Sequence, residues 1–248
     1  MGFLFSESEM SRLKMLAEGE AKESLSAHAR RKRWKKDTFF LKGGRPTGKL
    51  GILRLQPCQT GSPPDKVIPF HKAVTLWKAG KRLFQHAIVH FFEEDYSFER
   101  LWNNPKRYLA MLKHYKYVIM PDFSMKIGQR PIAQMVNLDR NHLLGHWLQQ
   151  NEVKLVPSCC WSGGASFSWC FSGLPEGGTF AISMTGCMGN DMSKSAFSSG
   201  LKALFKHAKP DVVWLFGSHP NQEVEDFISS HCKCIFINTN HYGQQRSF

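Results

Sequence analysis

The sequence has no long hydrophobic run, few acidic residues for its many basic ones, and none of several short signatures of common enzyme classes. Every apolar stretch falls far short of the ~20 residues that a membrane-spanning helix needs, which excludes an integral membrane protein. The patterns C-x-x-C, G-x-G-x-x-G and G-x-S-x-G are absent. A paired-cysteine site, a dinucleotide-binding loop and an α/β-hydrolase elbow therefore have no support.

The composition is that of a folded chain from a reducing compartment. Its 248 residues are 42% hydrophobic and 12% aromatic, which argues against wholesale disorder. Acidic residues follow the apolar start of the chain and no basic residue precedes it, so we expect no secretory signal. The seven cysteines are odd in number, so we expect reduced thiols and a cytoplasmic protein.

Positive charge is concentrated near the start of the chain. The chain has 33 Lys and Arg residues and 20 Asp and Glu residues, which gives a net charge of +13. Residues 1–54 alone hold 13 of the basic residues and 6 of the acidic ones. The densest run is Arg30, Arg31, Lys32, Arg33, Lys35 and Lys36, with Trp34 inside it. Such a run attracts polyanions, and its aromatic ring can stack on an unpaired base. We therefore predict nucleic-acid binding here, with a solvated arm as the alternative.

The composition and the hydrophobic pattern of the sequence change near residue 65. Residues 8–26 have a sparse apolar stripe typical of a helix, and Gly and Pro are frequent from 43 to 64. Beyond that point short apolar runs alternate with helical patterns. We therefore predict a basic N-terminal helical arm with its lead-in over 1–64, and an α/β domain over 65–248.

The α/β domain is predicted to contain a mostly parallel sheet of about six strands. Continuous apolar runs that alternate with helices are typical of a parallel sheet with helices on both faces, either Rossmann-like or a partial barrel. The expected strands are 87–92, 117–120, 154–157, 179–184, 212–216 and 234–238. The expected helices are 97–114, 132–150, 193–209 and 221–230, and 159–178 is expected to be a loop or a very short helix.

Acidic residues follow two of the expected strands. Functional groups collect beyond the carboxyl ends of parallel strands, and Asp95 and Asp122 occupy such positions. Two carboxylates on neighbouring strand ends can share a Mg²⁺ or Mn²⁺ ion that binds phosphate and activates water. We therefore predict catalytic and metal-binding roles for both. The alternative is structural, because Asp often caps a helix or braces a turn.

Other residues after the expected strands are weaker candidates for a functional site. Cys159 or Cys160 with His219 or His241 would form the thiol–imidazole pair of a nucleophilic hydrolase, while buried cysteine is the commoner outcome. Trp161 is either part of an aromatic wall over a pocket or a core residue.

A set of motifs resembles an uncharacterised domain family carried by bacteriophages, plasmids and other bacterial mobile elements. The residues that carry the resemblance are Phe92, Asp95, Phe98, Trp102, Asn103, Pro121-Asp122-Phe123-Ser124, Pro131, Asn137, Arg140, Gly145, Pro157, Trp161, Ser162, Cys170–Pro175 and Gly186. The Pro-Asp-Phe-Ser motif is its clearest element, and the resemblance covers about residues 65–240. His142 stands where the family pattern leads us to expect a second basic residue after Arg140.

The resemblance implies a mobile-element protein in the cytoplasm of a bacterial host. It brings no accepted activity or cofactor, but it places Asp95, Asp122, Arg140 and Trp161 on motif positions, and we take these four as candidate catalytic residues. The leading hypothesis is a protein that acts on or binds nucleic acid, as a metal-assisted phosphodiesterase or nucleotide-processing enzyme. The alternatives are a non-catalytic accessory module for replication or counter-defence, which binds nucleic acid or protein, and a small-molecule hydrolase.

Overall fold

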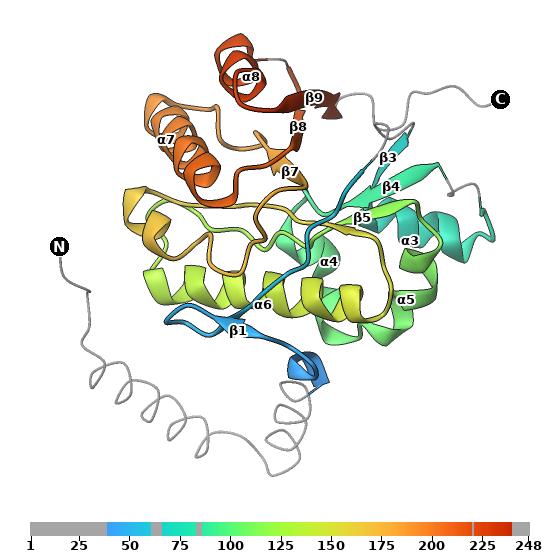
Figure 1. The fold of residues 1–248 in the computed structure, drawn as a ribbon. Coiled ribbons are helices and arrows are strands. Elements are labelled where there is room, and N and C mark those ends of the chain that lie inside the picture. Colours follow the sequence, from blue (N-terminus) through green and yellow to red (C-terminus); the bar gives the residue numbers. More distant parts are fainter. Residues whose placement is uncertain (1–38, 61–65, 83–85, 220, 240–248) are drawn as a thin grey trace. The chain divides into compact units, whose positions relative to one another are not determined.

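The computed structural model describes residues 39–60, 66–82, 86–219 and 221–239. The chain divides into two compact units, Met1–Lys42 and Gly43–Phe248. The α/β fold belongs to the second unit (Figure 1). The predicted helix over 8–26 and the basic run over 30–36 lie outside the described residues. The predicted domain boundary at residue 64 falls within the second unit and stays a prediction.

Seven parallel strands in the described part of the chain form two sheets. The first sheet has the order β3-β4-β5-β6 and the second the order β7-β8-β9. The strands are β3 (Lys66–Pro69), β4 (Ala87–His90), β5 (Tyr117–Ile119), β6 (Leu155–Val156), β7 (Thr179–Ser183), β8 (Val212–Gly217) and β9 (Lys233–Asn238). A parallel bridge between Ser158 and Ala181 joins the sheets, so all seven strands follow one another in chain order. A short antiparallel hairpin, β1 (Pro46–Thr47) and β2 (Ile52–Leu53), precedes them.

Helices connect most of the strands. They are α3 (Phe70–Lys78), α4 (Asp95–Asn103), α5 (Lys106–Lys113), α6 (Pro131–Gln150), the 3₁₀ helix η1 (Gly164–Ser168), α7 (Asp191–Ala208) and α8 (Gln222–Ser229). None of the helices in the described part of the chain combines the length and apolarity that crossing a bilayer requires.

The six predicted strands are confirmed as β4 to β9, but the count of six is wrong. The additional parallel strand, β3, is short, begins with exposed Lys66 and ends in Pro69, so its sequence carries little strand signal. The predicted helix over 97–114 is interrupted at Asn104 and Pro105, between α4 and α5. Proline has no N–H and restricts the residue before it, which ends the first helix there.

The sheet curls so strongly that strands far apart in its order touch across its inner face. The rings of Tyr117 on β5 and Trp214 on β8 lie 5.8 Å apart, edge to face. In a flat sheet, strands three positions apart would be separated by about 14 Å. The inner face closes around a core of fully buried residues: Ile88, Ile119, Val156, Ala181, Trp214 and Phe216. The second unit is therefore an α/β fold with a strongly curled parallel sheet.

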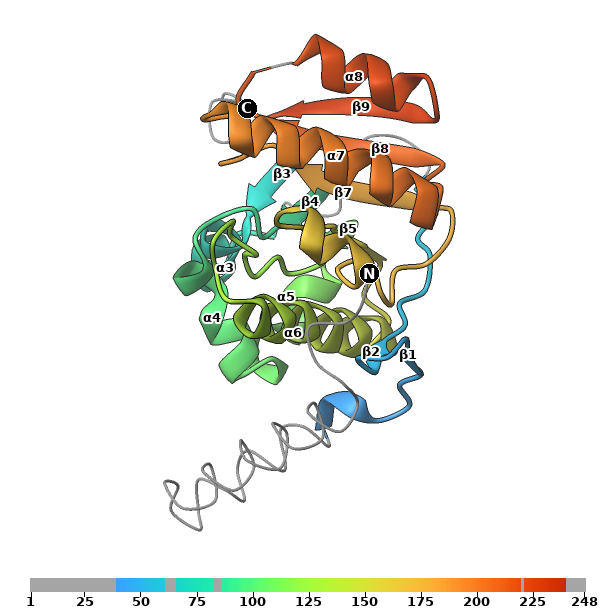
Figure 2. The ribbon, with the colours of Figure 1, turned by 90° about the vertical axis from the view of Figure 1, so that its left-hand side faces the viewer.

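The helices lie on the outer side of this curled sheet, so the expectation of helices on both faces is wrong. Phe70 of α3 and Phe98 of α4 both pack on Phe91, which follows β4 and faces outward. Phe205 of α7 packs on Phe227 of α8. Figures 1 and 2 show the helices along the outside of the strands. Strands in chain order joined by right-handed connections place all connecting helices on the same face.

We expect that Gly200→Ala destabilises the fold. Gly200 lies in α7, where a Cβ would stand 2.1 Å from Nε1 of Trp161. That indole is held by a 3.2 Å hydrogen bond to the carbonyl of Ala196, so it cannot move aside freely. We expect a loss of roughly 1–3 kcal/mol in the free energy of unfolding, measured in urea.

Gly164→Ala is the matched control, because a Cβ at Gly164 meets nothing within 4 Å. Its effect should stay within about 1 kcal/mol. Equal stabilities of the two variants would contradict the packing of α7 against Trp161.

Candidate functional site

Three strand ends converge on the carboxyl group of Asp122. The loop after β5 carries Asp122, the segment after β6 carries Cys159 and Cys160, and the segment after β7 carries Cys187. The negative charge of Asp122 contributes to the raised pKa of all three thiols, so the groups are electrostatically coupled. We define these four residues as the strand-end site. Its position is the one at which parallel α/β folds collect functional groups.

The Asp122 carboxyl group is partly buried and incompletely hydrogen-bonded. Its Oδ1 is shielded from solvent and has no hydrogen-bond partner among the described residues. Burial raises the pKa of Asp122 to about 7, a hydrogen bond with Cys160 acts in the opposite direction, and the charge of Asp95 raises the pKa further. A carboxyl group with this pKa is present in both protonation states near neutral pH, which suits proton transfer.

The surrounding thiols are protonated. Burial is the main reason that the pKa values of Cys159 and Cys160 lie well above the usual value, and Asp122 raises them further. Within the described residues, His219 makes no hydrogen bond or ion pair with either thiol, and His241 lies outside them. The thiolate that a cysteine nucleophile needs is therefore disfavoured.

Side chains from two helices hold the Asp122 loop in place. Asn141 of α6 is fully buried, and it accepts a 2.7 Å hydrogen bond from the Phe123 amide while donating one of 3.2 Å to the Phe123 carbonyl. Asn137 donates a 2.8 Å hydrogen bond to the carbonyl of Ser124. Asp95, at the start of α4, accepts hydrogen bonds from the amide and hydroxyl of Ser124 at 2.9–3.3 Å. The backbone on the C-terminal side of Asp122 is thus fixed by both α4 and α6.

These contacts bear on the predicted metal site at Asp95 and Asp122. Both oxygens of Asp95 accept hydrogen bonds from Ser124, so Asp95 has a structural role, although not the helix cap expected as the alternative. No cluster of three or more His, Cys, Asp and Glu in the described ranges is placed to hold a metal ion. The hydrogen bonds from Ser124 occupy the Asp95 oxygens that a metal ion would need. A shared Mg²⁺ or Mn²⁺ ion stays a prediction.

Arg140 of α6 lies against the other side of the loop. Its guanidinium is 3.6 Å from the ring centroid of Phe123 and 5.1 Å from that of Trp102, and it donates a hydrogen bond to the carboxylate of Glu99. Stacking on an aromatic face is a preferred environment for arginine. Nε of Arg140 is enclosed and has no hydrogen-bond partner in the described part of the chain. The observed contacts make Arg140 a support for Phe123.

Trp161, the fourth candidate, is in van der Waals and hydrogen-bonding contact with α7. Its ring packs on Phe171 and Phe197, and its N–H donates to Ala196. The structure thus places Asp122 with Asp95, and Arg140 with Phe123, while Trp161 contacts another element. The catalytic roles of these four residues stay predictions, and the predicted nucleic-acid-binding residues, 30–36, lie outside the described residues.

Two buried residues at this end of the fold were missing from the predicted set. His90, the last residue of β4, accepts a 3.2 Å hydrogen bond on Nδ1 from the amide of Phe92, and burial lowers its pKa to about 3. It is therefore neutral at physiological pH. A histidine that ends an apolar strand was the sequence signal for it. Asn141 had no such signal, because its role depends on a loop 18 residues away.

Comparison with known proteins places this fold in an uncharacterised family. Residues 46–236 match a family described as a domain of unknown function, DUF4417. The chain is 33% identical to the Gene 1 protein of Mycobacterium phage L5 over 129 residues, which are 52% of this chain and 56% of that protein. It is 32% identical to the Gene 1 protein of Mycobacterium phage D29 over 129 residues, 48% of that protein. The chain thus spans about half the length of these relatives. No solved structure matches it.

We expect that Asp122 makes the stability of the protein depend on pH. Its pKa is about 7 in the folded chain and about 3.9 in an unfolded one, so the folded state binds more protons between these values. The contribution of protonated Asp122 to the free energy of unfolding is fully present below about pH 4. It is lost as the pH rises to about 7. The change should be roughly 2–4 kcal/mol.

The measurement is urea unfolding of the wild type and of Asp122→Asn over pH 3.5–8. Asparagine has nearly the same shape and does not titrate, so the difference between the two proteins isolates this group. A difference that stays constant over the whole pH range would contradict the raised pKa.

Proposed function

Because the chain belongs to the DUF4417 family, we propose that it is a phage-type protein that binds nucleic acid in the bacterial cytoplasm and transfers protons at Asp122. The observation that carries the catalytic part is the enclosed, unpartnered carboxyl oxygen of Asp122 at the convergence of three strand ends. The binding part rests on the net charge of +13 and the basic run from Arg30 to Lys36.

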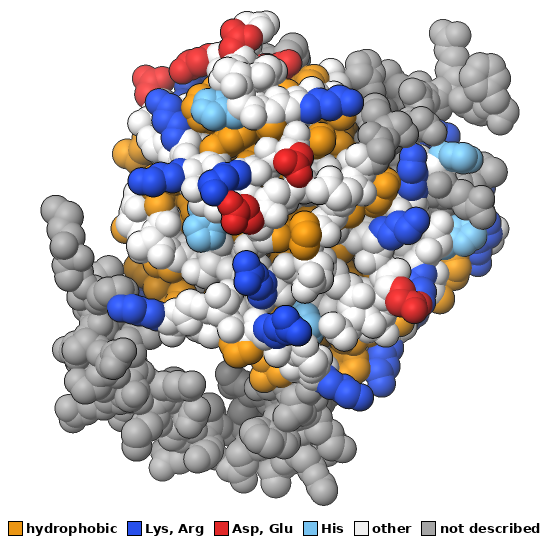
Figure 3. Space-filling model, in the orientation of Figure 1, with side chains coloured by type: hydrophobic (Ala, Val, Ile, Leu, Met, Phe, Trp, Pro, Cys, Tyr) orange, Lys and Arg blue, Asp and Glu red, His pale blue; other side chains and the backbone are white. Residues whose placement is uncertain are grey.

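The charge distribution of the second unit supports a polyanionic partner. In Figure 3, Lys and Arg side chains are spread over the visible face, while part of the acidic side chains gather over α8. Glu223 and Glu225 lie in the first turn of that helix, where negative charge favours the helix dipole. These two acidic residues thus stabilise α8 locally. The excess positive charge of the protein attracts polyanions at long range.

Asp122 supports a hydrolytic reaction of the acid–base type. In its carboxylate form it can take a proton from an attacking water, and in its protonated form it can give one to a leaving oxygen. Burial maintains the raised pKa of Asp122, and the protonated thiols around it do not compete as nucleophiles. Asp95 positions the loop through Ser124, and Asn141 does so through Phe123. We propose phosphodiesters or nucleotides as the substrate class, since the net positive charge favours such ligands.

The alternative is a non-catalytic module that binds nucleic acid or protein in replication or counter-defence. It needs the positive charge and the rigid α/β fold but no chemistry at Asp122. A small-molecule hydrolase of the cysteine type is less well supported, because burial keeps its thiols protonated.

We expect that nucleic-acid affinity falls steeply with salt and depends on the basic run. In the full chain, the triple substitution Arg33→Gln, Lys35→Gln and Lys36→Gln should weaken binding of single-stranded DNA and RNA. It should reduce the slope of log K against log [salt] by about 2, since each phosphate contact contributes ~0.7 for single strands. Fluorescence anisotropy over a salt series measures both quantities.

The matched control removes the same charge elsewhere, at the exposed residues Lys72, Lys78 and Lys202. This control should leave the slope nearly unchanged. Binding that is insensitive to salt in the wild type would rule out a polyanionic partner.

We expect that Asp122→Asn abolishes turnover but leaves nucleic-acid binding intact. Cleavage of oligonucleotides and hydrolysis of nucleotides are assayed with Mg²⁺, with Mn²⁺ and with chelator. The rate should change with pH about a midpoint near 7, the pKa of Asp122, and loss of acid–base assistance should slow it at least ~100-fold. Asp226→Asn, the same change at an exposed position of α8 outside the strand-end site, is the control and should leave turnover unchanged. Binding without turnover under any of these conditions would favour the non-catalytic module.

A further inference from the structure

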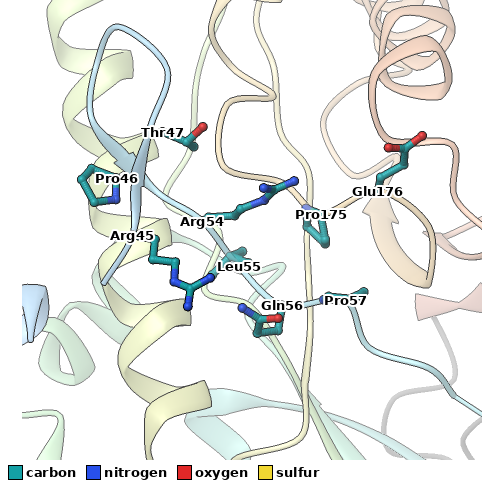
Figure 4. Close-up of a pocket in the computed structure, with 9 residues that line it drawn as sticks. All are labelled: Arg45, Pro46, Thr47, Arg54, Leu55, Gln56, Pro57, Pro175 and Glu176. Atoms are coloured by element: carbon teal, nitrogen blue, oxygen red, sulfur yellow. The ribbon is translucent and has the colours of Figure 1, made fainter. Parts of the chain in front are cut away.

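A second candidate site lies away from Asp122. A cavity of about 400 Å³ is bordered on one side by the β1–β2 hairpin and the extended residues after it, and on the other by Pro175 and Glu176 (Figure 4). Glu176 precedes β7, so this cavity lies at the amino end of that strand, whereas the strand-end site lies at the carboxyl ends. None of the roles predicted from the sequence involves the β1–β2 hairpin.

Two arginines occupy directly opposed backbone positions on this hairpin. The amide of Arg54 donates a 2.9 Å hydrogen bond to the carbonyl of Arg45, which extends the ladder beyond the pair Pro46 and Leu53. Directly opposed residues of an antiparallel pair place their side chains on the same side, and both arginines line the cavity.

No acidic group among the described residues forms an ion pair with either arginine. Neither guanidinium makes a hydrogen bond or ion pair with any residue that the structure describes. Glu176 lies on the rim, but its carboxylate pairs with Lys209 at 2.5 Å. Lys209 is also the main reason that the pKa of Glu176 is lowered, and Arg54 contributes less. The donors of both arginines are thus available to a ligand.

The backbone that carries these donors is held firmly. The amide of Leu55 donates to the carbonyl of Gly173 at 2.9 Å, and the side chain of Gln149 binds both the amide and the carbonyl of Gln56. Along the chain, Leu53 and Leu55 are buried while Arg54 and Gln56 are exposed, which is the alternation of an extended strand. Arg54 and Gln56 therefore stand on one side of a fixed segment. Such preorganisation lowers the entropic cost of binding a ligand.

We propose that this cavity binds a phosphate group, held by the guanidinium groups of Arg45 and Arg54 and by the side-chain amide of Gln56. Guanidinium forks match the spacing of phosphate oxygens and form strong, charge-assisted pairs with them. Phosphate binding as such is independent of the proposed function. The source of the phosphate, a nucleic-acid strand or a free nucleotide, rests on it.

The experiment is a titration of the full-length protein with inorganic phosphate, followed by calorimetry and by the arginine Nε–Hε signals in NMR. Arg54→Gln and Arg45→Gln should each weaken binding at least ~10-fold, as loss of a charge-assisted pair implies. Glu176→Gln should strengthen it by about 2–3-fold, because it removes a negative charge from the rim. Lys72→Gln, which removes a charge from α3, should change nothing.

The named outcomes decide the proposal. Unchanged phosphate affinity in Arg54→Gln, or weaker affinity in Glu176→Gln, would overturn it. The Glu176 variant guards against a trivial loss of folding, since a gain in affinity requires a folded site. Competition then identifies the source, with a single-stranded oligonucleotide in one arm and a mononucleotide in the other. If phosphate binds at the arginines but the oligonucleotide neither competes nor binds, the phosphate site is confirmed and the proposed nucleic-acid function is wrong.

Discussion

The structure of the second unit depends on the burial of the inner face of its sheet. Seven parallel strands in chain order with right-handed connections send the helices to the outer side, so no helix covers the inner side chains. A flat sheet would leave those apolar side chains in water. The sheet instead curls until residues such as Tyr117 and Trp214, from strands three positions apart, are in contact. This curvature also draws the carboxyl ends of the central strands together.

Burial at those strand ends determines the chemistry of the candidate site. The same low-polarity environment raises the pKa of Asp122, keeps the nearby thiols protonated and keeps His90 neutral. Positive charge is found elsewhere in the second unit, on the hairpin that carries Arg45 and Arg54. The buried strand ends favour neutral groups, whereas the exposed hairpin favours anions. The two environments can exist in one fold because they are separated in space. The proposed roles, proton transfer within and phosphate binding outside, follow that separation.

Much of this fold could be predicted from the sequence, because apolar runs and helical periodicity are local properties. All six expected strands are present, and the break before α5 reflects a proline that the sequence displays. β3 escaped prediction because four residues with an exposed lysine and a terminal proline do not form a strand pattern by themselves. The side of the sheet on which the helices lie also escaped, since it depends on strand order, and strand order is a property of pairing between distant segments. The candidate site was predicted in part. Asp122 and Asp95 were found from their positions after strands, while Asn141 and the contact of Arg140 with Phe123 were not.

The amino-acid sequence by itself determined which segments become strands and helices, where the acidic residues stand relative to strand ends, and the excess of positive charge. Only the tertiary structure decided what those residues are able to do. The pKa of Asp122 depends on enclosure by chain segments that follow three different strands. The placement of Arg45 and Arg54 at one cavity depends on a pairing across a turn. Both depend on distances that the fold sets, and the pKa depends also on the dielectric environment. Local sequence patterns carry no information about such distances until the chain is folded.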